Sequence, residues 1–102
     1  MEIQFLDKHL EDFVHSLERA TFNRVIRMID YLEKMGHQIR MPHAKKISHN
    51  LFELRIKGAE QVRIFFAYHH HKIFLLHGFT KKTQQIPLAE LRLAEQKLRS
   101  LH

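Results

Sequence analysis

The sequence contains no cysteine, and this absence removes several classes of function at once. Disulfide bonds, thiolate metal sites and a cysteine nucleophile are all excluded. The chain also lacks any apolar run near the roughly 18 residues needed to span a bilayer. Its N-terminus opens with acidic residues and lacks the basic-then-apolar order of a signal peptide. We therefore expect a cytoplasmic protein with no membrane association.

Sequence motifs for common cofactors and hydrolases are missing as well. There is no glycine-rich phosphate loop, no serine-hydrolase elbow and no His-Glu-x-x-His spacing. Ten histidines are present, and His69, His70 and His71 are consecutive. Consecutive residues on a strand or turn point in different directions, so they seldom form one ligand set. We expect neither a cofactor nor a functional metal site.

Positive charge is concentrated in the centre of the chain. The net charge is +6, and the segment from Arg40 to Lys82 holds nine basic and only two acidic residues. The remainder is close to neutral, so the whole excess belongs to this segment. Such a distribution favours a nucleic-acid or acidic protein partner. A solvated basic surface without a dedicated partner is the alternative.

Helical periodicity appears at both ends of the chain. Residues 5–17 place apolar side chains on one stripe, and Thr21 is a suitable cap for a second helix that ends at Gly36. The two stripes are close in length, which predicts an antiparallel helical hairpin packed on a sheet. A last helix is expected to begin at Pro87, a favoured first helical position.

The middle of the chain has the pattern of an antiparallel meander. Strands are expected near residues 51–57, 61–68 and 72–79, joined by short hairpin links. The polar segment before them is predicted as a loop, with a short strand near Ile47. With 102 residues, the chain is expected to form a single α+β domain over 1–102.

Alternation along the strands predicts a basic platform. Glu53, Arg55 and Lys57 share one face of the first strand, opposite its apolar side. If the apolar sides of both strands face inward, Arg63 joins them on one open surface, next to the turn formed by residues 81–84. The third strand is apolar on both faces, so alternation does not orient it.

A platform of this kind suits metal-independent cleavage of RNA. The 2′-hydroxyl of RNA is the nucleophile, and arginine can hold the phosphate and stabilise the charge that develops on it. Proton transfer requires a base and an acid, for which Glu53, His77 or a lysine are candidates. Simpler alternatives exist: Arg55 and Arg63 in surface ion pairs, Glu53 as their partner, and His77 as a hydrogen-bonded structural residue.

Three blocks of sequence resemble the phage-derived HigB branch of the RelE/ParE toxin superfamily. They are Leu51–Arg55 (LFELR), Arg63–Phe66 (RIFF) and Leu75–Gln84 (LLHGFTKKTQ), followed by a helix pattern at Pro87, Glu90, Leu91 and Ala94. One departure is Ile86, where the family usually has a helix-capping threonine before the proline.

The resemblance implies a RelE-like fold and the toxin of a type II toxin–antitoxin pair. Such toxins typically cut mRNA in the ribosomal A site and so inhibit translation. A helix-turn-helix, HigA-like antitoxin neutralises them, and we expect the complex to bind its own operator DNA through the antitoxin. We assign catalytic roles to Arg55, Arg63, Lys81, Lys82, Glu53 and His77. We assign substrate binding to Lys45, Lys46, Lys57, Thr83 and Gln84.

Two other functions are compatible with the same sequence. ParE-like members of the superfamily inhibit DNA gyrase without cutting RNA, and a basic surface suits that role too. An inactive homologue that retains only antitoxin binding is the other. The arginines of the central strands and the HGFTKKTQ turn favour the ribonuclease.

Overall fold

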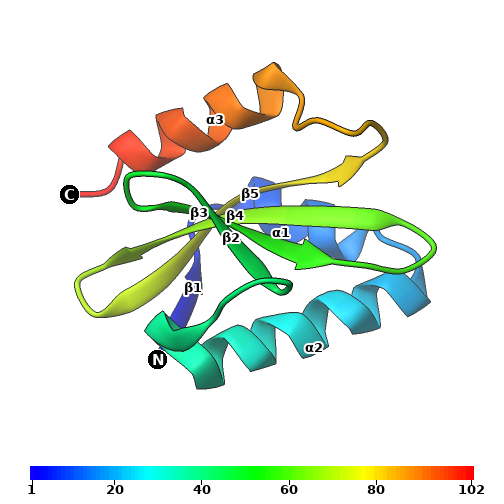
Figure 1. The fold of residues 1–102 in the computed structure, drawn as a ribbon, viewed down its shortest axis with the longest axis horizontal. Helices are drawn as coiled ribbons and strands as arrows, with labels where there is room; N and C mark the ends of the chain where they lie inside the picture. Colours follow the sequence, from blue (N-terminus) through cyan, green and yellow to red (C-terminus); the bar gives the residue numbers. More distant parts are fainter.

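The computed structural model describes residues 1–102 and consists of a five-stranded sheet with helices on both faces (Figure 1). The elements in chain order are β1 (Ile3–Phe5), α1 (Lys8–His15), α2 (Arg19–Met35), the 3-10 helix η1 (Gly36–Gln38), β2 (Ala44–Ser48), β3 (Leu51–Ile56), β4 (Gln61–His69), β5 (Lys72–Lys81) and α3 (Leu88–Arg99). The α+β class, the meander β3–β4–β5 and the short strand before it are as predicted. No helix has the length and apolar character needed to cross a membrane.

The strand β1 was not predicted, and it shortens the first helix. The sheet order is β1-β5-β4-β3-β2, and β1 adds to β5 in parallel. Phe5 fits a helical stripe equally well, so the prediction of a helix from residue 5 was wrong. The helix begins after Asp7, whose extended backbone and side chain form its N-cap. The hairpin of α1 and α2 therefore has arms of 8 and 17 residues, which are not close in length.

The start of α2 and the start of α3 also differ from the predictions. Thr21 does not cap α2; it is buried in the first turn, and its hydroxyl donates a 3.2 Å hydrogen bond to Glu60 Oε1. Gly36 ends α2 with a φ of 55°, as predicted. Pro87 is the N-cap of α3 rather than its first helical residue, and no side chain caps this helix. The hydroxyl of Thr83 donates instead to the backbone of Gln85.

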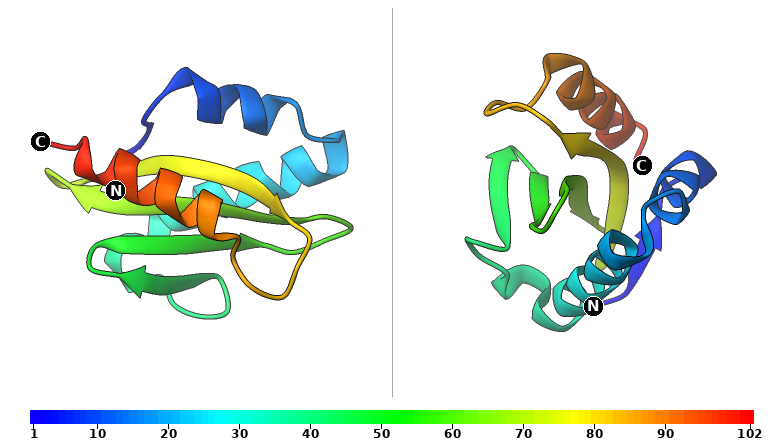
Figure 2. Two further views of the ribbon diagram at one scale, coloured as in Figure 1. Left: turned by 90° about the horizontal axis from the view of Figure 1, so that it is seen from above. Right: turned by 90° about the vertical axis from the view of Figure 1, so that its right-hand side faces the viewer.

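The sheet separates two apolar layers. Helices α1 and α2 cover one face, where Leu10, Val25 and Leu32 pack against alternate residues of β3, β4 and β5. Helix α3 covers the other face, where Ala94 packs against a cluster that contains Phe65 and Leu76. Figure 1 shows α3 and α2 on opposite sides of the strands, and Figure 2 shows how strongly the sheet curves between them. The predicted apolar sides of β3 and β4 do face α2.

A bulge in β5 changes which residues of that strand face α3. Phe66 pairs with Leu75 and Phe65 pairs with His77, so Leu76 is an extra residue in the ladder. Before the bulge, Ile73 and Leu75 belong to the layer under α1 and α2. After it, odd-numbered residues such as Phe79 lie in the α3 layer instead. The sequence did not reveal this switch.

Gly78 allows α1 to lie close against β5. A Cβ atom at this position would be 3.0 Å from Leu10 Cδ1 and from two ring atoms of Phe13. We expect Gly78→Ala to lower the free energy of unfolding by about 1–3 kcal/mol, because the core has no room for the methyl group. Urea denaturation measures this. The control is Gly58→Ala, where the new methyl meets only the flexible Arg24 side chain and should cost about 0.5 kcal/mol or less.

Asp7 connects α1 with α3, and its ionisation should stabilise the fold. Burial raises the pKa of its carboxyl, but the Leu10 N–H and the Lys97 ammonium outweigh burial, so the pKa lies below its usual value of 3.8. The Lys97 Nζ–Asp7 Oδ2 distance is 3.1 Å. We expect Asp7→Ala to cost about 1 kcal/mol at neutral pH.

The pH dependence of this effect has a definite sign. Because the folded pKa of Asp7 is lowered, its contribution is present above pH 3.8 and is lost as the pH falls through the folded value. Urea denaturation of the variant and the wild type should therefore converge in acid. Asp12→Ala, in an exposed pair with Lys8, serves as the control and should change little. A constant difference between Asp7→Ala and wild type across this pH range would contradict the assignment.

Candidate active site

A polar cavity lies where the ends of β3, β4 and β5 meet the turn before α3. Its volume is about 480 Å³, and none of its lining side chains is apolar. Its lining residues come from β3, β4, the end of β5 and the turn that follows β5, and Figure 1 shows the β3–β4 hairpin and that turn on the right-hand side of the molecule. We call it the Arg63 cavity, and its lining residues are Arg55, Gln61, Arg63, Lys81, Lys82, Thr83 and Gln84.

The strand register brings these residues together. Arg55 pairs with Arg63, and Gln61 pairs with Lys81, so all four side chains emerge on the α3 side of the sheet. Lys82, Thr83 and Gln84 follow directly in the exposed turn. Six residues that the sequence singled out therefore surround one space. Four of them are cationic, and no carboxylate lines the cavity.

A buried carboxylate lies beside the cavity, between its two arginines. Glu53 Oε1 is 3.7 Å from Arg55 Nε, and Glu53 Oε2 is 3.8 Å from Arg63 Nε. The side chains of Glu53 and Arg63 are each only 4% exposed, and that of Arg55 is 21% exposed. The prediction of an open platform was therefore wrong for Glu53 and Arg63. Alternation identifies the face of a residue but not whether that face is covered, and here the side chains of Glu53 and Arg63 are both buried.

Hydrogen bonding at this pair of arginines is incomplete. Glu53 Oε2, Arg55 Nε and Arg63 Nε are buried atoms without a hydrogen-bond partner. Arg63 Nη1 donates to the Val62 carbonyl at 3.1 Å and makes a long contact of 3.5 Å to Gln61 Oε1. Such unpartnered groups are costly unless a ligand or water satisfies them. The donors that face the cavity come from its lining as a whole, which has four cationic side chains and two amides.

The charge of Arg63 is held in an unfavourable environment. Burial lowers the pKa of its guanidinium from the ordinary value, and the neighbouring Arg55 lowers it further, while Glu53 opposes both. An arginine remains protonated even so. Positive charge is therefore concentrated where solvent screens it little, and an anion entering the cavity would relieve this repulsion.

His77 lies outside the cavity. It is buried, and its Nε2 is 2.9 Å from Glu90 Oε1 of α3. Its ring stacks on that of His9 in α1, with ring centroids 6.5 Å apart. Four residues of strand, about 13 Å, separate it from Lys81. The structure therefore places His77 in a hydrogen-bonded contact between β5 and the helices, away from the arginines.

The remaining predicted lysines are also placed apart from the Arg63 cavity. Lys45 pairs with Glu53 across β2 and β3, and Lys46 pairs with Phe52 and so faces the other way. Both border a separate hollow near Arg40. Lys57 lies just beyond β3 and lines a different cavity, next to α2. None of the three lines the Arg63 cavity.

One lining residue was missed by the sequence analysis. Gln61 shares its face with Arg63, as alternation indicates, but no charge or motif drew attention to it. Its side-chain amide donates to the Gly58 carbonyl at 3.4 Å. No three side chains of His, Asp or Glu are grouped in a way that could hold a metal ion.

The architecture and the position of the cavity define a class of protein. A short helical hairpin on one face of a curved sheet, with a C-terminal helix on the other, is the arrangement of a small RelE-like domain. A comparison with family models gives the family itself: residues 12–99 match the phage-derived Gp49-like proteins, and the chain belongs to this family. The family is one of RelE/HigB-like toxins associated with toxin–antitoxin systems, which implies an antitoxin partner. A search of curated proteins finds no significant match.

Glu53 should stabilise the fold through the arginines that it separates. We expect Glu53→Gln to lower the free energy of unfolding by about 3 kcal/mol, because two neighbouring guanidinium groups would lose their counter-charge. Urea denaturation measures this, with the exposed Glu11→Gln as the control. In a double-mutant cycle, Arg63→Gln should recover part of the loss. Wild-type stability of Glu53→Gln would show that solvent, not Glu53, balances the arginines.

Proposed function

We propose that this protein is the toxin of a type II toxin–antitoxin pair, and that it is a metal-independent endoribonuclease of the HigB type. Its substrate is mRNA on the ribosome, so its action inhibits translation. Family membership supports the toxin role. The Arg63 cavity is the observation that carries the enzymatic part, because it gathers four cations and two amides around one space with no carboxylate in its lining.

The cavity would bind the scissile phosphate. Arg55 is half-buried and has an unpartnered Nε, and its guanidinium can grip phosphate oxygens in a fixed geometry. Arg63, its neighbour across β3 and β4, is a second, buried positive charge. As the 2′-oxygen attacks phosphorus, negative charge grows on the non-bridging oxygens, and both arginines stabilise it.

Residues from the turn before α3 complete the reaction. The 2′-hydroxyl gives its proton to solvent water as its oxygen forms a bond to phosphorus, the bond to the 5′-oxygen breaks, and a 2′,3′-cyclic phosphate remains. Lys81 and Lys82 line the cavity and can donate a proton to the leaving 5′-oxygen. Gln61, Thr83 and Gln84 offer neutral hydrogen bonds that orient the ribose and the base. Glu53 is beside the cavity rather than in its lining, so we assign it to holding the arginines and not to proton transfer.

The partners follow from the same proposal. A helix-turn-helix antitoxin of the HigA type neutralises the protein, and the complex binds its own operator DNA through the antitoxin. The ribosome positions the mRNA codon at the cavity. The protein acts in the cytoplasm, where both partners are found.

Cleavage of a defined mRNA with and without programmed 70S ribosomes tests the proposed function. We expect cuts within the A-site codon only when ribosomes are present. Arg55→Ala and Lys81→Ala should each lower the rate constant about 100-fold or more, the effect of removing a group that stabilises transition-state charge. Both side chains are partly exposed, so the variants should fold. Arg92→Ala, an exposed change on α3 outside the cavity, is the matched control and should cleave normally.

Two outcomes would contradict the proposal. A folded Arg55→Ala/Lys81→Ala double variant that cleaves at the wild-type rate would show that the Arg63 cavity is not the active site. Wild-type protein that is folded and free of antitoxin, yet cleaves nothing in either condition, would exclude the nuclease. Gyrase inhibition, or antitoxin binding without catalysis, would then be the favoured function.

A further inference from the structure

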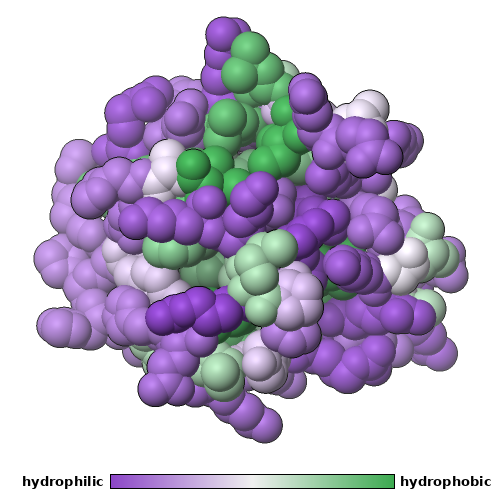
Figure 3. All heavy atoms as spheres, viewed as in Figure 1, coloured by the Kyte–Doolittle hydropathy of each residue, from purple (hydrophilic) through white to green (hydrophobic).

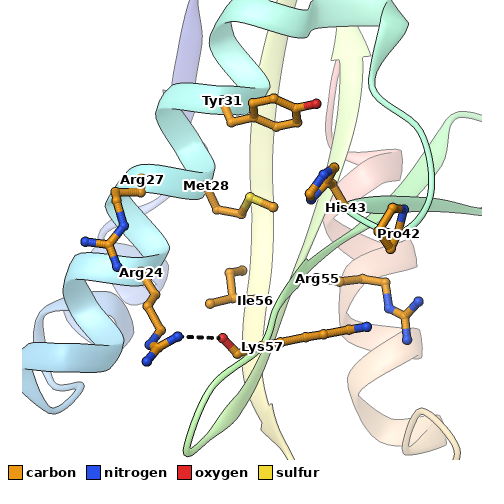
Figure 4. A pocket seen from close by; sticks show the side chains of 9 residues that line it. All are labelled: Arg24, Arg27, Met28, Tyr31, Pro42, His43, Arg55, Ile56 and Lys57. Carbon is orange, nitrogen blue, oxygen red and sulfur yellow. Dashed lines mark hydrogen bonds between the residues drawn. The ribbon is translucent and has the colours of Figure 1, made fainter.

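A second cavity, of about 450 Å³, lies between α2 and the segment that leads into β2 (Figure 4). We call it the Tyr31 cavity. Four of its nine lining residues carry positive charge, and none is acidic. They are Arg24, Arg27, Met28, Tyr31, Pro42, His43, Arg55, Ile56 and Lys57.

Two arginines of α2 form one wall of this cavity. Arg24 and Arg27 are exposed and lie one helical turn apart. Arg24 Nη1 donates to the Lys57 carbonyl at 3.4 Å, which holds its side chain against the β3–β4 hairpin. A Cβ atom at Gly58 would lie 2.9 Å from Arg24 Cδ and Nε, so glycine leaves the room that this arginine occupies. The Arg24 side chain therefore lies along the β3–β4 hairpin at the edge of the cavity.

The opposite part of the cavity is aromatic and apolar. The rings of Tyr31 and His43 meet edge to face, with centroids 4.8 Å apart. Both side chains are partly exposed, and Met28 and Ile56 form the apolar surface beside them. Flat rings next to cations are a combination that binds a nucleotide in a single strand, since bases stack and phosphates pair with arginine.

Arg55 lines both the Tyr31 cavity and the Arg63 cavity. Figure 4 shows Arg55 and Lys57 extending to the same side, away from α2. RNA that leaves the Arg63 cavity past Arg55 could reach the Tyr31 cavity, which Lys57 and the two arginines of α2 also line. Arg55 is thus a positive charge shared by the two cavities at the end of β3.

We propose that the Tyr31 cavity binds a nucleotide of the single-stranded RNA that flanks the scissile phosphate. Its base stacks on the Tyr31–His43 pair, and Arg24 and Arg27 hold its phosphates. The inference rests on the proposed ribonuclease function, because it takes the scissile phosphate to lie in the Arg63 cavity. With this second site, binding would depend on the length of the RNA and on the identity of one base that flanks the scissile phosphate.

Fluorescence anisotropy with uncleavable 2′-O-methyl oligoribonucleotides tests this site without requiring catalysis. We expect Arg24→Ala/Arg27→Ala to weaken binding of an octanucleotide at least tenfold and to leave a dinucleotide unaffected. The slope of log affinity against log salt concentration should fall by about 1.4, the value for two lost phosphate contacts on a single strand. Tyr31→Leu should weaken octanucleotide binding about fivefold or more, as expected for the loss of base stacking.

The matched control is Arg19→Ala/Lys34→Ala. It removes two cations from the same helix, and neither residue lines a cavity described above. This variant should bind the octanucleotide almost as the wild type does. The arginine double variant changes only exposed side chains, so it stays informative even if Tyr31→Leu fails to fold.

The outcomes separate this inference from the proposed function. If Lys81→Ala lowers cleavage as expected but Arg24→Ala/Arg27→Ala binds the octanucleotide normally, the inference is wrong and the nuclease stands. The Tyr31 cavity would then be open to an acidic segment of the antitoxin. If wild-type protein cleaves nothing, yet the arginine variant loses affinity for the octanucleotide but not for the dinucleotide, the RNA site stands and the nuclease does not.

Discussion

The extra residue in β5 is the constraint on which the candidate site depends. Without the bulge at Leu76, period-two alternation would place Lys81 on the same face as Ile73 and Leu75, beneath α1 and α2. With it, Lys81 emerges beside Gln61 on the face that carries Arg63. One residue therefore decides whether the basic turn and the central arginines surround the same space.

The second requirement is a carboxylate that lets two arginines approach each other in a buried place. Glu53 lies within 4 Å of both guanidinium groups, yet it leaves donors of each unpartnered. The rigid strands β3 and β4 hold this group, whereas the exposed turn after Lys81 supplies the outer residues. An anion would meet charge that is already in position, and little reorganisation would be needed when it binds. The face drawn in Figure 3 is mostly hydrophilic, and its most prominent apolar area lies at the top, over α3, the helix on which Leu88 and Leu93 are exposed.

Alternation and helical periodicity predicted most of the fold because they report directly on burial. They failed where a helix and a strand fit the same pattern of apolar residues. Phe5 suits a helical stripe and a three-residue strand equally well, and the capping of α1 by Asp7 decides between them. They also failed where a strand is apolar on both faces, since β5 then carries no sign of its bulge. Faces were predicted correctly for Glu53 and Arg63, but their burial depends on tertiary packing, which no local pattern encodes.

Counting charge along the sequence also failed to predict the full extent of the basic surface. Counting along the chain assigns the whole positive excess to the segment from Arg40 to Lys82, but Arg24 and Arg27 of α2 line a cavity together with Arg55 and Lys57 of that segment. When charges are counted along the sequence, acidic residues in and before α2 offset the basic residues of that helix. None of these acidic residues lines the cavity. Local field depends on which side chains share a space, and screening removes the contribution of charges more than about 10 Å away. The basic surface is therefore larger than the sequence indicates, and its extent matches a ligand that continues beyond one phosphate.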